Sequence, residues 1–468
     1  MRVQAAGEKK LRQGRSHVDI QIVFANLKQP SPPISFCSST IKEKLLSLSN
    51  RIADVRAGFH PTFWIANGME LFERLAYYGQ QIVFAVYVRN QLGFSEAEAG
   101  QLSGIFGGLI YLLPILAGTL ADNWGFRRAF NVAFSILGIG YFLIGSLGMD
   151  AFAGIYGDKH NYWLLMAFLI LTAFGGSFIK PSVLGTVAMT SSEKTKSLGF
   201  AIYYWIVNIG AMIGPTIAYF VRDAAGNPFV FMVSSLSCFA MLIVNLLLYK
   251  EVKGKEPLVP ESFGKKIANL FIVLGNIKFM IFLLIYSLYW IIFWQEFIIV
   301  PYYITDFIDK VAPYEIIQSW AGAGAIILFQ IPLNWLTKNI PTRTAIVLGF
   351  AISSLMWVII GIHPSIPTIA AGIVAFAIGE MIQAPRYYEY ISEIAPPGQQ
   401  GLYQGYAFLP IAIARFVGDP FGGWIYQTAK AEGKPELIWF SLIAVGVAGA
   451  VLMWLYNLVV TRAEQANR

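Results

Sequence analysis

Six ionisable side chains lie inside long apolar stretches of the sequence, where an unpaired charge is costly. They are Glu70, Glu73, Arg74, Lys180, Glu296 and Glu380. Charged groups within a bilayer usually pair with one another or face a water-filled cavity. An unpaired buried carboxyl gains a proton and an unpaired buried amine loses one, so their charge states are coupled. The set predicts a site that moves protons together with a charged solute.

The spacing of these residues indicates how they could pair. Glu70 and Arg74 are four residues apart, so they share a helix face and can form an ion pair. Glu73 then points elsewhere, and Lys180 is the expected partner. Lys180 precedes Pro181, where a helix can bend. The alternative is a static salt-bridge network that locks the helices together.

Two further charged pairs have simpler interpretations. Arg415 and Asp419 are four residues apart within an apolar run, and a packing role is expected for them. Arg386 and Glu389 lie near a helix end, and they fit interfacial or gating charges.

The composition excludes most soluble classes. Of 468 residues, 56% are hydrophobic and 13% are charged, whereas soluble domains have about 25% charged residues. Cys37 and Cys238 cannot build a disulfide framework. A cytosolic enzyme, a nucleic-acid binder and a disulfide-rich secreted domain are therefore excluded. The sequence predicts an integral membrane protein.

Twelve apolar runs are long enough to cross a bilayer, which requires about 20 residues. They lie near 61–89, 102–122, 128–148, 162–186, 197–221, 228–249, 273–305, 314–336, 342–362, 367–392, 402–426 and 436–460. This pattern predicts an all-α membrane protein with twelve transmembrane helices in two six-helix halves. The intramembrane charges fall in spans one, four, seven and ten, each of which leads a three-helix unit, as in transporters built from repeats.

The charges outside the spans predict the domain order and the orientation. Residues 1–57 have a net charge of +6 and form a basic tail. Residues 41–55 have the spacing of an amphipathic helix on the membrane, and a solvated leader helix fits nearly as well. The halves are residues 58–249 and 273–468, joined by a loop at 250–272. Basic residues gather in the loops on the side of the tail, so both termini are expected in the cytoplasm.

Four segments resemble one transporter family. Residues 70–79, Glu-Leu-Phe-Glu-Arg-Leu-Ala-Tyr-Tyr-Gly, resemble the ExxERFxYYG motif of the proton-coupled oligopeptide transporters, within the major facilitator superfamily. Residues 178–182 are similar to the family's FKPN stretch, and residues 203–210 to its FYxxINxG signature. Residues 379–385 resemble its GExxxSP segment. Residues 118–128 resemble the loop that the whole superfamily has between helices two and three.

The resemblance implies a proton-coupled symporter that imports di- and tripeptides or similar zwitterions by alternating access. The implied proton-coupling residues are Glu70, Glu73, Arg74, Lys180, Glu296 and Glu380. The implied substrate contacts are Arg74, Tyr77, Tyr78, Tyr111, Lys180, Asn208, Trp294 and Glu380. The implied gating residues are Asp122, Arg127 and Arg128. For Tyr111, plain packing is a strong alternative. The expected partners are a small peptide-like substrate, protons and the lipid bilayer of the cell membrane, with no nucleic acid, and the chain is expected to be monomeric.

Departures from the family pattern leave the substrate class open. The family usually has Arg where this chain has Gln81, and Ser where it has Ala384. Ala321-Gly322 replaces Asn-Pro in span eight, and Glu296 follows Phe293-Trp294 sooner than the usual acidic residue. A transporter of another small organic or inorganic anion is the alternative, followed by a channel or a receptor. No catalytic motif, metal site or cofactor site is found, so an enzyme is not expected.

Overall fold

The computed structural model describes residues 58–158, 160–192, 195–252, 272–397 and 399–466. The described residues from Phe59 onward form one compact unit. The predicted basic tail, its amphipathic helix and most of the predicted loop at 250–272 lie outside the described residues, and these predictions remain untested.

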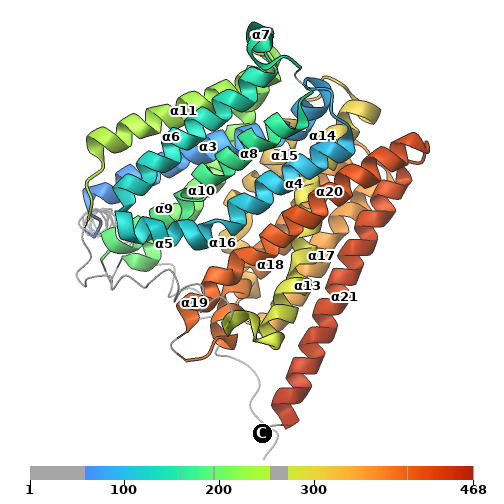
Figure 1. The fold of residues 1–468 in the computed structure, drawn as a ribbon. Coiled ribbons are helices and arrows are strands. Elements are labelled where there is room, and N and C mark those ends of the chain that lie inside the picture. Colours follow the sequence, from blue (N-terminus) through green and yellow to red (C-terminus); the bar gives the residue numbers. More distant parts are fainter. Residues whose placement is uncertain (1–57, 159, 193–194, 253–271, 398, 467–468) are drawn as a thin grey trace, which may run out of the picture. The chain divides into compact units, whose positions relative to one another are not determined.

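Helices make up the N-terminal half (Figure 1). They are α3 (Pro61–Asn90), α4 (Glu96–Leu112), α5 (Pro114–Trp124), α6 (Phe126–Leu147), the short η1 (Asp150–Phe152) and α7 (Ala153–Tyr156), α8 (Tyr162–Gly176), α9 (Ile179–Thr190), α10 (Lys196–Ala225) and α11 (Asn227–Leu248). The β pairing within the described residues is one isolated bridge between Phe59 and Ser191.

The C-terminal half is also helical, with more interruptions. Its elements are α13 (Ile277–Trp294), η2 (Gln295–Phe297), α14 (Ile299–Tyr303), η3 (Ile304–Ile308), α15 (Tyr314–Ser319), η4 (Trp320–Gly324), α16 (Ala325–Thr337), α17 (Thr342–Ile362), α18 (Ile366–Ile394), α19 (Gln400–Gly405), η5 (Tyr406–Phe408), α20 (Leu409–Ala431) and α21 (Glu436–Ala466).

These helices match the twelve predicted spans. Within the described residues, nine helical segments are long and apolar enough to cross a membrane, and α4 with α5 forms a tenth that is bent by 43°. The two remaining long helices are α3 and α20, which carry Glu70, Glu73 and Arg74, and Arg415 and Asp419, respectively. The predicted all-α membrane fold is confirmed.

Local sequence explains where several spans begin. Ser95 and Glu98 form a capping box at the start of α4, with the Ser95 hydroxyl accepting from the Glu98 N–H at 3.2 Å. The Asn161 side chain caps α8 by accepting from the Leu164 N–H at 3.0 Å. Gly125 has a φ of 86° between α5 and α6, a conformation that favours glycine. These signals are local in sequence, so they mark the helix ends without reference to tertiary contacts.

Two spans are interrupted where predicted charged residues lie, and a third is interrupted at Gly322. Residues 177–178 separate α8 from α9, so Lys180 and Pro181 lie in the first turn of α9, directly after an interruption of the helix. Glu296 lies in η2, a 3-10 turn, and Gly322 lies in η4, a π turn. Such turns inside long helices often mark functional sites, because they free backbone groups and change the direction of side chains.

Helices α4 and α20 run side by side and join the two halves (Figure 1). A Cβ on Gly100 would lie 2.5 Å from the Asp419 carbonyl, and one on Gly104 would lie 2.7 Å from that of Arg415. Small residues at these positions therefore allow the two backbones to approach closely. The predicted Arg415–Asp419 pair is confirmed, at 3.1 Å and fully buried.

The Arg415–Asp419 pair also crosses between the halves. Ser103 of α4 donates its hydroxyl to Asp419 at 2.9 Å, and its backbone carbonyl accepts from Arg415 at 3.2 Å. The Arg415 guanidinium lies 4.2 Å from the centre of the Trp294 ring. The pair therefore packs at the interface between the two halves, as a packing role expected from sequence would require. The contact with Arg415 also holds the Trp294 ring in position.

Glycines also bring α10 against α3 beside the charged motif. A Cβ on Gly210 would lie 2.5 Å from the Arg74 Cβ, and one on Gly214 would lie 2.6 Å from the Leu75 carbonyl. The glycines thus let α10 cover the face of α3 that carries Arg74. This packing shields the Arg74 side chain from lipid and sets Asn208, two residues before Gly210, at the edge of a cavity.

Candidate functional site

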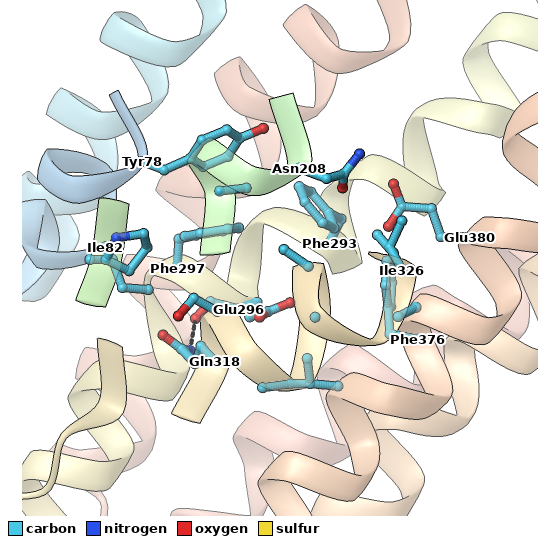
Figure 2. A pocket seen from close by; sticks show the side chains of 17 residues that line it. Tyr78, Ile82, Asn208, Phe293, Glu296, Phe297, Gln318, Ile326, Phe376 and Glu380 are labelled. Carbon is cyan, nitrogen blue, oxygen red and sulfur yellow. Dashed lines mark hydrogen bonds between the residues drawn. The ribbon is translucent and has the colours of Figure 1, made fainter. Parts of the chain in front are cut away.

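A cavity of about 100 Å³ lies between the two halves. Figure 2 shows its labelled side chains converging from both halves. Tyr78 and Asn208 come from α3 and α10, while Glu296 and Glu380 come from η2 and α18. Four residues expected from sequence at the site therefore line one cavity. Sequence reasoning missed two further polar residues, Gln318 and Ser319 of α15.

The polar atoms that face this cavity are mostly hydrogen-bond acceptors. The Asn208 amide N–H₂ donates to the Tyr204 carbonyl at 2.9 Å, which leaves its oxygen for the cavity. Glu296 and Glu380 add two carboxylates. Because acceptors bind donors, this part of the site suits an ammonium group rather than a carboxylate.

The charged motif of α3 forms a closed, buried cluster next to the cavity wall. The Arg74 guanidinium pairs with the Glu73 carboxylate and, at 3.4 Å, with Glu70. It also lies 4.9 Å from the centre of the Tyr77 ring. Glu70 is 0% exposed and Arg74 is 5% exposed. The predicted Glu70–Arg74 pair is confirmed, and Arg74 is engaged on two sides in this conformation.

The predicted pairing of Glu73 with Lys180 is wrong for this conformation. Glu73 accepts instead from the Nε of its neighbour, Arg74. Among the described residues, no carboxylate oxygen lies within 4.0 Å of the Lys180 amine. The physical reason is that the long Arg74 side chain bends back along the helix and reaches both carboxylates, so Glu73 needs no partner from α9.

Lys180 lies over aromatic rings instead. Its amine is 4.9 Å from the centre of the Tyr111 ring and 5.0 Å from that of Phe408. The negative faces of such rings attract a cation weakly, by about 0.5–2 kcal/mol. An ammonium that lies over rings and, among the described residues, forms no ion pair with a carboxylate remains able to bind an incoming anion. Lys180 is therefore the positive group with the greatest freedom to contact a substrate carboxylate.

A chain of rings links Lys180 to the cavity. The Tyr111 and Trp294 rings are 6.0 Å apart, and Trp294 lies 5.0 Å from Phe293, which lines the cavity. Tyr77 and Trp294 are both 1% exposed, and neither lines this cavity. The structure therefore places Tyr77 beneath Arg74, and Trp294 beneath Arg415. Both rings pack against cationic side chains and do not line the cavity. Tyr111 lies between Lys180 and Trp294.

A charged network that sequence reasoning missed joins the halves at one end of the bundle. Asp306 of η3 accepts from Arg89 of α3 at 2.8 and 2.9 Å, from Lys430 of α20 at 2.8 Å and from Tyr426 at 2.9 Å. Lys430 also donates to Glu96 of α4 at 3.2 Å. We call this end of the bundle the network end. Arg89 and Glu96 belong to the N-terminal half, so the contacts hold the halves together there.

A second bridge reinforces the same end. Arg222, near the end of α10, pairs with Glu315 in the first turn of α15. The Arg222 guanidinium also lies 5.2 Å from the centre of the Tyr314 ring. At the opposite end, the ion pairs of the described residues, such as Arg343 with Glu464 at 2.6 Å, stay within the C-terminal half. In this conformation, ion pairs between the described residues of the two halves close the bundle at the network end.

Weakening the network should open that end. In Asp306→Asn, Arg89 and Lys430 lose their shared charged acceptor, and the closed state should lose about 2 kcal/mol, or roughly 30-fold in population. Spin labels on Gly154→Cys and Lys310→Cys, one in each half, should report longer distances than in the parent. Lys434→Gln, which removes an exposed pair with Glu432 inside one half, is the control. Unchanged distances in Asp306→Asn would contradict the role of the network.

The predicted gating residues lie in the last turn of α5 and the first turn of α6. The Glu251 carboxylate accepts from the N–H groups of Phe126 and Arg127 at 3.0 and 2.8 Å. The Arg127 side chain donates to the Leu246 carbonyl at 2.6 Å, and Asp122 and Arg128 are exposed. Leu246 lies in the last turn of α11 and Glu251 follows that helix closely, so these contacts tie α6 to the end of α11 in this conformation. A gating role for the three residues stays a prediction.

The network residues were hard to find from sequence. Arg89, Glu96, Asp306 and Lys430 lie at the ends of four different apolar runs, where a charge is ordinary. The signal that could have found them is their complementary sign at equivalent ends of spans from opposite halves. Gln318 carries no charge and gave no signal at all.

Comparisons with known proteins agree with this architecture. Multidrug resistance protein MdtH of Enterobacter sp. (strain 638) is 21% identical over 371 residues, covering 78% of this chain and 86% of that protein. Dipeptide and tripeptide permease B of Salmonella typhimurium (strain LT2) is 30% identical over 227 residues, or 47% of this chain and 43% of the permease.

A solved structure and a family profile extend the similarity. A POT family transporter in complex with 5-aminolevulinic acid superposes with a TM-score of 0.69 and 17% identity, over 85% of this chain and 95% of the other. Residues 69–309 and 314–468 match the profile of the Major Facilitator Superfamily. Because this match covers most of both halves, the chain belongs to the Major Facilitator Superfamily and is a membrane transporter with multiple spans.

Proposed function

We propose that the chain is a proton-coupled symporter that imports di- and tripeptides or similar small zwitterions. The observation that carries this proposal is the separation of charge at the site. Lys180 is a cation without a carboxylate partner among the described residues, and Glu380 with Asn208 offers acceptors in the adjoining cavity. A zwitterion needs a cation for its carboxylate and acceptors for its ammonium group. The names of the permease and of the POT family transporter support the same solute class.

Each end of the substrate has its own residues in this proposal. Lys180 binds the carboxylate of the peptide, and Arg74 joins it when Arg74 is released from Glu73. Glu380 and Asn208 bind its amino group, and Tyr78 contacts its backbone. Tyr77, Tyr111 and Trp294 hold these groups in place. Charge-assisted hydrogen bonds of this kind are worth about 1.5–3 kcal/mol each, so both ends contribute strongly to affinity.

Proton coupling uses the Arg74 cluster. A proton on Glu73 removes the strongest partner of Arg74, and the freed guanidinium can then join Lys180 at the substrate carboxylate. When the substrate leaves, Arg74 returns to Glu73 and the proton is released, because a carboxylate beside a cation holds a proton less tightly. The membrane potential adds about 2.3 kcal/mol per charge per 100 mV to inward proton movement. Glu70, Glu296 and Glu380 are further candidates for carrying protons.

The orientation follows from the loop charges. With the basic loops and both termini in the cytoplasm, the network end faces outward. The structure then corresponds to a state closed to the outside of the cell membrane. Opening requires the network residues to separate and the opposite end to close, where Asp122, Arg127 and Arg128 are the proposed gating residues. A single chain of two halves suffices for this motion, so we propose a monomer.

Uptake into liposomes tests the function. Purified protein in liposomes should concentrate labelled dialanine when the outside is made acidic and the inside negative. A protonophore should reduce the final level to equilibration. Free alanine and a dicarboxylate without an amino group should neither be concentrated nor compete. Concentration of an anion without an amino group, or of no solute under a proton gradient, would contradict the proposal.

A further inference from the structure

The cavity between the halves is lined by two carboxylates and by no basic side chain. Its 17 lining residues include Glu296 and Glu380, and none of them is Lys, Arg or His. The amino group of an ordinary dipeptide balances only one of the two carboxylates. In Figure 2, Glu296 and Glu380 come from different walls of the cavity. The second carboxylate therefore has no cation assigned to it.

Glu296 is well buried but faces the cavity. It is 6% exposed, and among the described residues none donates a hydrogen bond or forms an ion pair with its carboxylate. A Cβ on Gly322 would be in van der Waals contact with its Oε1, at 4.0 Å, so the glycine leaves this oxygen without a side chain over it at that point. Burying an ionised carboxylate without a partner is strongly unfavourable. A cation in the cavity would remove this penalty.

Gln318 supplies an independent observation at the same wall. Its amide nitrogen donates to the backbone carbonyl of Glu296 at 2.6 Å, which fixes the orientation of the amide (Figure 2). Its Oε1 is then left as an acceptor, and this buried atom has no hydrogen-bond partner. Gln318 is 2% exposed and lines the cavity. The Glu296 carboxylate of η2 and the Gln318 Oε1 of α15 are thus two acceptors without a hydrogen-bond donor among the described residues.

Aromatic rings complete this wall. Phe293, Phe297 and Phe376 line the cavity, with the Phe293 ring 5.6 Å from that of Phe297 and 5.5 Å from that of Phe376. Aromatic faces attract cations and also cover the methylene groups of a long side chain. Acceptors beside rings are the surroundings that suit an alkyl chain ending in a positive charge.

We propose that Glu296 and Gln318, with these rings, form a subsite for a second positive charge of the substrate. The group that fits is the ammonium or guanidinium of a lysine or arginine side chain. The inference rests on the proposed peptide transport, in which Glu380 and Asn208 hold the amino group. It predicts a transporter that prefers dipeptides with one basic residue over neutral dipeptides of the same size.

Equilibrium binding tests the subsite without relying on transport. Calorimetry on the purified chain should compare Ala-Lys and Lys-Ala with Ala-norleucine and norleucine-Ala, which keep the alkyl chain but lack the terminal ammonium. At least one lysyl peptide should bind about tenfold more tightly than its norleucine partner, because a hydrogen bond to a charged group is gained. Ala-Glu should bind more weakly than either.

Two variants test whether Glu296 and Gln318 cause the preference for lysyl peptides. Glu296→Gln keeps the shape of the side chain and removes the charge, so the ratio of lysyl to norleucyl affinity should fall to about threefold or less. Gln318→Leu should lower the ratio by a smaller factor. Lys310→Gln, which removes an exposed charge at the network end, is the matched control and should leave the ratio unchanged.

The outcomes separate the subsite from the proposed function. Equal affinity of the parent for lysyl and norleucyl peptides overturns the subsite, and would mean that a proton neutralises Glu296. A ratio that persists in Glu296→Gln also overturns it. Tight lysyl binding without proton-driven uptake in liposomes supports the subsite and contradicts only the symport proposal. Binding of none of the four peptides overturns both.

Discussion

Lys180→Ala is expected to abolish accumulation of dipeptides while leaving the protein folded. The Lys180 amine lies over the Tyr111 and Phe408 rings and, among the described residues, pairs with no carboxylate. Its removal therefore breaks no ion pair of the described fold. It does remove a charge-assisted bond of about 1.5–3 kcal/mol to the substrate carboxylate, which is a roughly tenfold or greater loss of affinity. Uptake at several dialanine concentrations in liposomes measures this loss.

An amide of the substrate makes this experiment specific. The parent should bind dialanine about tenfold more tightly than dialanine amide, which lacks the carboxylate, and Lys180→Ala should bind the two almost equally. Lys310→Ala, at an exposed position, controls for the loss of a lysine and should behave as the parent. A Lys180→Ala variant that still prefers dialanine over its amide would show that Lys180 does not contact the carboxylate.

Glu73→Gln is expected to uncouple transport from protons. The amide cannot carry the proton, but it resembles the protonated acid in shape and charge. Arg74 keeps Glu70 as a partner at 3.4 Å, so the buried cluster should survive. The variant should exchange labelled dialanine across a liposome membrane and fail to concentrate it under a proton gradient. Parallel exchange and gradient-driven assays on one preparation measure the two activities.

The control for this variant is an exposed carboxylate. Glu436→Gln, at the start of α21, should exchange and concentrate dialanine as the parent does. If Glu73→Gln concentrates dialanine equally well, Glu73 is not the coupling site, and Glu296 and Glu380 become the next candidates. Loss of both exchange and accumulation would instead indicate that the Glu73 charge is needed to assemble the site.

The sequence by itself determined the twelve spans and the residues of the α3 motif. Bilayer thickness sets the length of a span, so runs of apolar residues reveal the helices without any knowledge of tertiary contacts. The predicted run at 342–362 coincides with α17, and that at 314–336 ends one residue before α16 does. Charges inside such runs stand out for the same reason, and the i,i+4 rule gave the Glu70–Arg74 and Arg415–Asp419 pairs correctly.

Tertiary structure alone decided which charges meet across the bundle. The expected Glu73–Lys180 contact was wrong, because the reach of the Arg74 side chain settles the pairing of Glu73 within α3. The partners of Asp306 come from α3 and α20, more than a hundred residues away in opposite directions. Neither hydropathy nor helical periodicity carries information about which spans are neighbours. The packing of glycines such as Gly104 and Gly210 determines that, since it sets how closely, and in which register, two helices approach.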